Sequence, residues 1–422
     1  MRTIGRWVHE TAGGLPRQFW YLWCTTLINR VGSFVLIVLA IYLTSERGFS
    51  ETYAGIVIGL WGAGGAVGVM VGGVLADRWG RKPTLLAALW GGAAMMVVLG
   101  LVGDPIAIAI FAFLLGTVSE AARPALSALM VDIVPDRDRA RAFSLHYWVI
   151  NLAFAFAATV AGFVAGVDPR LLFLADAATM VAAGLWTAFM IKEPVRSRPA
   201  ADPSTTSPST VNEGLPAVLR DRVFLAFLTA NLLTAFVFLQ HISTLPMSMT
   251  RDGLSASSYG TVIALNGVLI VIGQLFVTRA LRRLDHTTAL AVACTVLGIG
   301  FGLTAFASTP IFYAITVLVW TTGEMFQAPS NATTVAALSP AHLRGRYMGV
   351  FGFSWGVASF LAPMLGGAVL QFGGQATLWL GCLGLSLAAA AMHLVARHSR
   401  DRRARQITAA ESSPVTLAAA TT

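Results

Sequence analysis

The sequence predicts an all-α membrane protein with twelve transmembrane helices, arranged as two parallel repeats of six helices each. Three observations support this prediction. The 422 residues are 56% hydrophobic and only 12% charged, which is about half the charged fraction of a typical soluble domain. Apolar segments of spanning length recur along the chain, giving a mean hydropathy of +0.71. The two halves of the chain also match one another in register.

Twelve apolar segments are bounded by clusters of Pro, Gly, Asp and Arg. A helix of about 20 residues crosses the hydrocarbon core of a bilayer, and longer segments cross it with some tilt. We expect the helices at 18–45, 51–77, 82–103, 105–134, 139–166, 170–192, 222–250, 256–282, 286–307, 310–338, 343–371 and 375–397.

The distribution of Lys and Arg predicts the side of the membrane that each loop faces. If the N-terminus is cytoplasmic, the outer loops hold only Arg47, Arg170 and Arg251, while Arg30 and Arg123 lie inside helices. All other Lys and Arg residues fall on the cytoplasmic side, as the positive-inside rule requires. The net charge of +9 therefore reflects topology and attraction to lipid head groups, and not nucleic-acid binding. We expect a multi-pass protein with cytoplasmic N- and C-termini. The Arg- and Ala-rich composition favours the inner (cell) membrane of a bacterium.

The chain contains two copies of one unit, related by a shift of 205 residues that superimposes Gly260 on Gly55. Because each copy holds six spans, both enter the membrane from the same side. Residues 1–192 are predicted to form an N-terminal six-helix bundle and residues 222–397 a C-terminal one. The same register also pairs Pro124 with Pro329, Pro135 with Pro340, Arg141 with Arg346 and Gly162 with Gly367.

Two polar segments lie outside the bundles. Residues 193–221 are rich in Pro, Ser and Thr and are expected to form a mobile cytoplasmic linker that tolerates changes in length. The cytoplasmic tail, residues 398–422, is polar and expected to lack fixed structure.

A recognisable motif, GVLADRWGRK at 73–82, closes the second helix and opens the third. It resembles the G-x-L-a-D-R-x-G-R-K signature of the major facilitator superfamily at every position. With the twelve spans and the parallel repeat, the resemblance covers essentially the whole chain. It implies a transporter with its substrate site between the two halves near the bilayer midplane.

The resemblance also implies a conformational latch. In similar proteins the residues that match Asp77, Arg81 and Asp132 form a charge network that holds the halves in the outward-open state. Gly73 is expected to let helix 2 approach a neighbour closely, and Gly80 to permit the tight turn. Arg78, Arg81 and Lys82 would hold the loop in the cytoplasm, and such an anchoring role without a latch is the alternative. In the second half Arg282 and Asp285 replace Asp77 and Gly80, so any latch there is of a different kind.

A second pattern concerns helix 5. Proton-driven drug exporters of this superfamily carry a Gly-rich stretch with Pro in that helix. Here residues 151–162 contain no Pro, while the aligned helix 11 carries Gly356, Pro363, Gly366 and Gly367. The sequence therefore departs from the exporter pattern in helix 5.

Ionisable residues inside spans are few, and each is a candidate for function. The candidates for proton coupling are Glu120, Glu324 and Asp176. Most candidates lie on helices 1, 4, 7 and 10, which the resemblance implies line the cavity. Structural alternatives remain: Glu120 and Arg123 can neutralise each other, Asp176 can be hydrated at the outer interface, and His241 can be a packing residue. The polar residues expected in the cavity are Arg30, Arg123, Gln240, His241 and Gln327.

The leading hypothesis is a proton-coupled exporter of lipophilic small molecules that works by alternating access. The alternative is a proton symporter that imports a sugar, peptide or organic anion. The sequence has no catalytic cluster, phosphate-binding loop or metal-ligand pattern, so we expect neither an enzyme nor a cofactor or metal. Its three cysteines, Cys24, Cys294 and Cys382, lie in apolar segments, and no disulfide is expected. The expected partners are a small-molecule substrate, protons and the lipid bilayer, and the expected state is a monomer.

Overall fold

The computed structural model describes residues 13–166, 168–193, 215–281 and 285–411, and every regular element in these ranges is helical. Three short 3₁₀ turns and one π turn, Tyr42–Glu46, accompany the α-helices. The α-helices are α2 (Arg17–Val31), α3 (Val35–Ile41), α4 (Glu51–Arg78), α5 (Arg81–Leu101), α6 (Pro105–Glu120), α7 (Ala122–Ile133), α8 (Arg139–Ala165), α9 (Pro169–Met190), α10 (Leu215–Arg220), α11 (Arg222–Phe238), α12 (Gln240–Arg251), α13 (Ala256–Leu281), α14 (His286–Leu303), α15 (Pro310–Leu338), α16 (Arg344–Val395) and α17 (Arg397–Glu411).

Ten helical stretches in the described part of the chain are long and apolar enough to cross a membrane. Helix α16 covers two of the expected segments, which meet at Gly374, where a φ of 80° interrupts the helix. Glycine adopts this conformation readily, so the chain can turn there. Helix α15 has 29 residues, which is long enough to span a membrane, but its polar side chains lower its mean hydropathy and it is not among these ten stretches.

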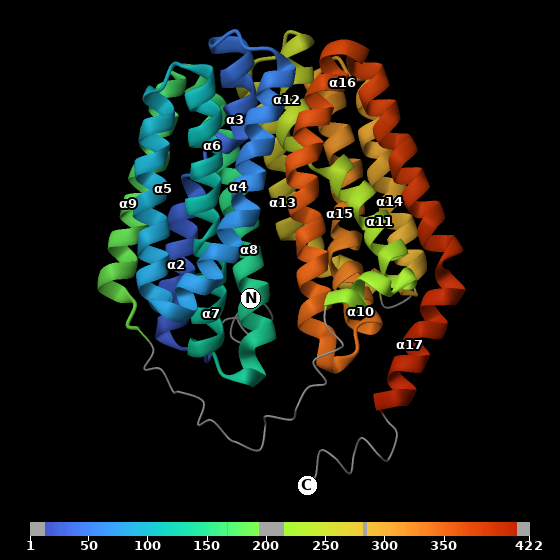
Figure 1. Ribbon diagram of the computed structural model, residues 1–422. Helices are drawn as coiled ribbons and strands as arrows, with labels where there is room; N and C mark the ends of the chain where they lie inside the picture. Colours follow the sequence, from blue (N-terminus) through green and yellow to red (C-terminus); the bar gives the residue numbers. More distant parts are fainter. Residues whose placement is uncertain (1–12, 167, 194–214, 282–284, 412–422) are drawn as a thin grey trace, which may run out of the picture.

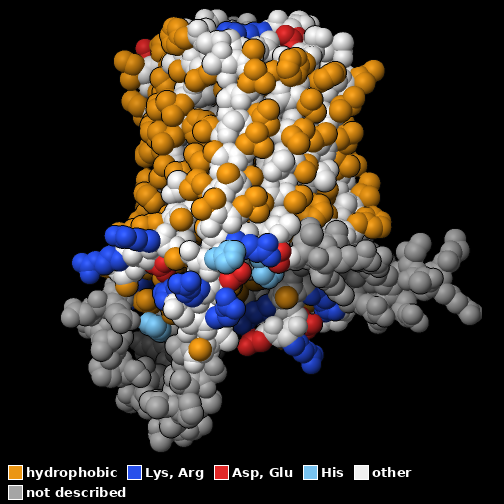
Figure 2. All heavy atoms as spheres, turned by 90° about the vertical axis from the view of Figure 1, so that its right-hand side faces the viewer, with side chains coloured by type: hydrophobic (Ala, Val, Ile, Leu, Met, Phe, Trp, Pro, Cys, Tyr) orange, Lys and Arg blue, Asp and Glu red, His pale blue; other side chains and the backbone are white. Residues whose placement is uncertain are grey.

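The helices form two bundles that stand side by side (Figure 1). Helices α2–α9 make the N-terminal bundle and α10–α17 the C-terminal bundle, and the two meet chiefly through α4 with α16 and α8 with α13. We call the lower end in Figure 1 the basic end, because helices there begin or end at Arg78, Arg81, Arg139, Arg222 and Arg344. The other is the far end. Hydrophobic side chains cover the face in Figure 2 from the far end down to a band of Lys and Arg.

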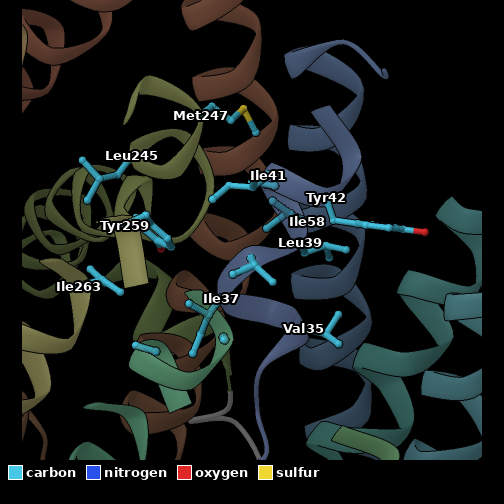
Figure 3. Packing of buried hydrophobic residues seen from close by; sticks show 14 of the residues in the cluster. Val35, Ile37, Leu39, Ile41, Tyr42, Ile58, Leu245, Met247, Tyr259 and Ile263 are labelled. Atoms are coloured by element: carbon cyan, nitrogen blue, oxygen red, sulfur yellow. The ribbon is translucent and has the colours of Figure 1, made fainter. Parts of the chain in front are cut away.

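The bundles touch closely toward the far end. A Cβ atom on Gly55 of α4 would lie 2.2 Å from the carbonyl oxygen of Pro363, and one on Gly367 of α16 would lie 2.4 Å from that of Glu51. Only glycine allows backbones to approach so closely. Helices α8 and α13 meet in the same way at Gly162. Figure 3 shows the apolar packing at this interface, where α3 lies near α12 and α13.

The bundles part toward the basic end. Positions for a Cβ on Gly345, Gly349 and Gly352 of α16 have no atom within 4 Å, and the same holds for Gly73 of α4. Met70 of α4 is 71% exposed. The expected close approach at Gly73 is therefore wrong for this conformation. Its neighbour Gly72 makes such a contact instead, with a Cβ position 2.4 Å from the carbonyl oxygen of Ala121.

Several local expectations are corrected. Helices expected to be continuous at 18–45, 105–134 and 222–250 are interrupted at 32–34, Ala121 and Leu239. Part of the expected linker, Leu215–Arg220, is the short helix α10, and most of the rest lies outside the described residues.

The tail was expected to lack fixed structure, but residues Arg397–Glu411 form helix α17. Arg397 forms an ion pair with Asp285 and Arg403 forms one with Asp221. Charged residues of the tail therefore bind it to the C-terminal bundle.

Candidate functional site

A small chamber lies inside the N-terminal bundle at the interruption between α2 and α3. Its volume is about 80 Å³, which holds several water molecules but not a drug-sized ligand. Three of the predicted site residues, Arg30, Glu120 and Asp176, line it together. The other lining residues are Asn29, Ser33, Val35, Leu36, Leu39, Trp61, Met96, Leu115, Ser119 and Met180.

Two interrupted helices supply the polar part of this chamber. Helix α2 ends at Val31, and Gly32 lies so close to Thr179 of α9 that a Cβ would overlap its hydroxyl. Helix α6 ends at Glu120, four residues before Pro124. Proline has no N–H, so it cannot supply the helical hydrogen bond to the Glu120 carbonyl. The interruption at this point thus follows from the sequence.

Asp176 is deeply buried at the chamber, not hydrated at an outer interface as one interpretation of the sequence held. Its side chain is 2% exposed. The Oδ2 atom accepts a hydrogen bond of 3.3 Å from the backbone N–H of Val35, the first residue of α3. The Oδ1 atom is buried and has no hydrogen-bond partner. The carboxyl group therefore caps the N-terminus of α3 through Oδ2, while its Oδ1 atom remains available as a hydrogen-bond acceptor.

Glu120 and Arg123 form an ion pair of 3.1 Å across the interruption between α6 and α7. The Glu120 side chain is 12% exposed and that of Arg123 is 65% exposed. The two therefore differ in position: Glu120 lines the chamber, whereas Arg123 lies outside its lining and is largely exposed. This contact fits the structural interpretation of the pair.

Glu324 lies in the other bundle, away from the chamber. Its Oε2 atom accepts a hydrogen bond of 2.7 Å from Asn266 of α13, which also donates to Thr321. Tyr147 of α8 is close enough to interact with Glu324 electrostatically. Glu324 therefore faces the opposite bundle, and Asn266 is a polar partner that sequence reasoning missed, because the contact joins residues 58 positions apart.

The predicted polar residues of the seventh helix, Gln240 and His241, are buried and hydrogen-bonded. Gln240 is fully buried, donates 2.9 Å to the carbonyl of Ala362 and accepts from Thr244. His241 is 6% exposed, contacts the Phe238 carbonyl through Nδ1 and packs near Trp320.

Gln327 on α15 is also buried. These three residues do not join Arg30, Glu120 and Asp176 in the chamber.

The predicted latch residues lie at the basic end of the N-terminal bundle. Arg81 forms an ion pair of 3.1 Å with Asp132 at the end of α7, which brings together two of the three residues of the expected network. Asp77 is exposed on the last turn of α4, and Gly80 turns the chain with a φ of 114°. Lys82 donates to the carbonyl of Ala188.

Glu193 also contacts the loop before α5, and the sequence did not predict this contact. Its two carboxylate oxygens accept hydrogen bonds from the backbone N–H groups of Arg81 and Lys82, at 3.0 and 2.9 Å. Glu193 therefore caps the N-terminus of α5, where a negative charge is stabilising. It comes from the end of the sixth span, and nothing in the local sequence indicates this distant contact.

In the C-terminal bundle the loop before α14 corresponds to the loop before α5, but the acidic and basic groups have exchanged places. There the acid lies in the loop: Asp285 caps α14 by accepting from Thr288, and Arg397 after the last span pairs with it at 3.2 Å. Hydrogen bonds from Thr288, and to a lesser degree the Arg397 guanidinium, hold the pKa of Asp285 below its usual value.

In the part of the chain that the structure describes, no three His, Cys, Asp or Glu residues come together as a metal site.

The sequence matches the Major Facilitator Superfamily over residues 22–363 and 323–421. One relative is the uncharacterized MFS-type transporter YqjV of Bacillus subtilis, 24% identical over 360 residues, or 84% of this chain and 87% of the relative. Another is a Na⁺, Li⁺, K⁺/H⁺ antiporter of Planococcus maritimus, 23% identical over 354 residues (77% and 83%). The multidrug resistance protein MdtH of Salmonella newport is 24% identical over 381 residues (87% and 88%).

Solved structures share the fold at low sequence identity. The nucleoside transporter NupG matches with a TM-score of 0.75 and 16% identity, over 90% of this chain and 99% of that one. The peptide transporter POT in complex with sulfate matches with a TM-score of 0.74 and 16% identity, over 92% and 96%. The helical fold, the spanning apolar helices and the match along nearly the whole sequence agree, and the chain therefore belongs to the major facilitator superfamily of membrane transporters.

Proposed function

We propose that the protein is a proton-coupled secondary transporter that exports lipophilic small molecules by alternating access. The observation that carries this proposal is the unequal contact between the bundles. They pack backbone to backbone at Gly55 and Gly367 near the far end, and they part beyond Gly73 and Gly352 toward the basic end. A transporter that rocks between two states needs one end closed while the other is open.

The basic end is proposed to face the cytoplasm. This orientation places the Lys and Arg residues that begin or end the helices on the inside of the membrane, in agreement with the positive-inside rule. Both termini would then be cytoplasmic, in the inner membrane of a bacterium, and the conformation described is the inward-open one.

Twelve spans in two parallel repeats are proposed on two grounds. The turn at Gly374 divides α16 into two helices of spanning length. The contact of Gly55 with Gly367 recurs as the contact of Gly260 with Gly162, and a shift of 205 residues relates each member of one pair to a member of the other. Because one chain would then contain both halves of the pathway, the functional unit is a monomer.

Export and proton coupling draw support from the relatives and from the chamber. One relative is named a multidrug resistance protein and another an antiporter that exchanges cations with H⁺. Glu120 and Asp176 lie in a chamber whose walls are otherwise largely apolar, including Trp61 and Met96. A carboxyl group in such surroundings is a candidate proton carrier.

The second candidate function is import of a small organic anion, sugar or peptide together with a proton. Arg30 is the observation in its favour, because it lines the chamber near the middle of the first span. A guanidinium group binds carboxylates and phosphates well.

Transport direction separates the two candidates. Everted membrane vesicles that contain the protein are energised so that their lumen becomes acidic, and a panel of fluorescent lipophilic cations and neutral dyes is added. The proposal predicts proton-driven uptake of some of these compounds into everted vesicles, which corresponds to export from the cell, and collapse of uptake by a protonophore. Accumulation only in right-side-out vesicles, or transport indifferent to the proton gradient, would contradict it.

A further inference from the structure

The chamber at the interrupted first span holds three buried oxygen atoms that lack a hydrogen-bond partner. They are Asp176 Oδ1, Asn29 Oδ1 and Ser119 Oγ, which come from three different helices. A buried acceptor without a donor is costly, and such groups in native proteins usually have an unseen water, ion or ligand as a partner. Three of them around one cavity indicate that the chamber receives water or a small ligand.

Two helix ends converge on the same chamber. Helix α2 runs from the basic end and ends at Val31, one residue after the chamber residue Arg30, while α6 runs from the far end and ends at the chamber residue Glu120. The C-terminal end of a helix carries partial negative charge. Pro124 also leaves the Glu120 carbonyl without its helical donor. Ends of discontinuous helices are a known way to coordinate a small cation inside a membrane protein.

Two carboxyl groups and two guanidinium groups surround the chamber. Its lining contains two carboxyl groups, Asp176 and Glu120, and one guanidinium group, Arg30, so the lining carries a formal charge of −1 when all three are ionised. Arg123 pairs with Glu120 from outside, where its side chain is 65% exposed. His146 of α8 lies within electrostatic range of Arg30. With Arg123 included, the four groups sum to zero when all are ionised, so replacing a proton on one carboxyl group by a monovalent cation leaves the charge of the chamber unchanged.

The size of the chamber fits a small ion. A volume of about 80 Å³ accommodates a sodium ion with one or two waters, but not an organic cation of drug size. Carboxylate, amide and hydroxyl oxygens are the ligands that hard cations prefer. Leu39, Trp61 and Leu115 also line the chamber, so part of its wall is apolar.

We propose that this chamber binds one sodium-sized alkali cation through Asp176 Oδ1, Asn29 Oδ1 and Ser119 Oγ, with Glu120 as a further carboxylate. The cation competes with protons for the carboxyl groups, so its occupancy falls as the medium becomes more acidic. The inference depends on the proposed function only in this competition, because Glu120 is also the proposed proton carrier. Binding itself is measured without transport.

The test uses purified full-length protein in lipid nanodiscs. The midpoint of thermal unfolding and the binding of radioactive sodium are followed as NaCl replaces choline chloride at constant ionic strength. We expect saturable binding of sodium that lithium displaces and that weakens at lower pH. Asp176→Asn retains an acceptor for the Val35 N–H, so it is expected to fold and to lower sodium affinity about tenfold or more.

Ser119→Ala is the second variant, because it removes one oxygen without altering charge, and it is expected to weaken sodium binding several-fold. Ser386→Ala is the matched control: the Ser386 hydroxyl is also buried without a partner, but it lies in the C-terminal bundle. Its sodium affinity should equal that of the parent.

Absence of saturable sodium binding in the parent, or an equal loss in Ser386→Ala and Ser119→Ala, would overturn the inference. A response to pH alone, with none to sodium, would also overturn it and assign the chamber to protons. Sodium binding without proton-driven export would support the proposed cation site and refute the proposed function.

Discussion

Glu51 and Arg251 join the two bundles at the far end. The guanidinium group of Arg251, at the end of α12, donates two hydrogen bonds to the Glu51 carboxylate in the first turn of α4, one of them 2.7 Å long. One residue further, the backbone N–H of Thr52 donates to Gln371 of α16. These contacts lie about one helical turn before the close approach of Gly55 to Pro363 along α4. The far end cannot open unless the ion pair of Glu51 and Arg251 separates.

Neutralising this pair should therefore favour the state that is open at the far end. We expect Glu51→Gln or Arg251→Gln to shift the ratio of the two states about fivefold, because a partly exposed ion pair contributes up to about 1 kcal/mol. Distances between spin labels on far-end loops of the two bundles measure the shift. The exchanged pair Glu51→Arg with Arg251→Glu should restore the parent distribution, and Arg170→Gln, at the same end, should not alter it. If the exchanged pair does not restore the parent distribution, the ion pair of Glu51 and Arg251 does not hold the far end closed.

The charges at the basic end should favour the opposite state. Asp77→Asn is expected to leave the protein folded and inserted but to slow transport, since the outward-open state loses part of its latch. A change of about 1.4 kcal/mol would alter the ratio of states tenfold. Asp132→Asn should act in the same direction, because Asp132 holds Arg81 in place.

Accessibility of cysteines introduced at the basic end measures this ratio. Asp136→Asn is the control, since the Asp136 side chain is 87% exposed at the same end. Equal inward and outward populations in Asp77→Asn and in the parent would refute the latch.

Glu193 offers a separate test of how the loop before α5 is held. Glu193→Ala removes both acceptors of the cap and should destabilise the first turn of α5 by about 1 kcal/mol. Glu193→Gln keeps one acceptor but loses the charge, so an intermediate effect is expected. Hydrogen exchange of the Arg81 and Lys82 amides reports it directly. The exposed acid Glu46, at the far end, provides the control Glu46→Ala; unchanged exchange in Glu193→Ala would mean that the cap is dispensable.

The sequence was sufficient to predict an all-helical membrane protein and the positions of its long apolar helices, because hydropathy and the Pro, Gly and Asp residues at helix ends act locally. Asp104 and Asp285, for example, cap the helices that follow them. The register of glycines was equally informative: Gly55 and Gly260 occupy corresponding places, and both prove to be points of close contact between the bundles. Pro124 could also have signalled the interruption after α6.

Other features depend on contacts between distant segments and left no local signal. The cap from Glu193 to α5 and the hydrogen bond from Asn266 to Glu324 join residues more than 50 positions apart. The tail after Arg397 is as polar as a disordered segment, yet its arginines pair with acids at the start of α11 and α14. Sequence placed Arg30, Glu120 and Asp176 in three different spans, and only the fold brought them into one chamber.

Proton coupling should reside in one of the buried carboxyl groups, and Glu120 is the first choice. It lies between the chamber and Arg123, so a rearrangement of this ion pair during rocking can change its affinity for a proton. Glu324, held by Asn266, is the alternative. In proteoliposomes, Glu120→Gln should abolish accumulation driven by a pH gradient while retaining exchange of substrate down its own gradient, whereas Glu46→Gln should behave as the parent. If Glu120→Gln still accumulates substrate and Glu324→Gln does not, the coupling residue is Glu324. If both accumulate it, Asp176→Asn is the decisive variant, and accumulation by all three would exclude coupling through these carboxyl groups.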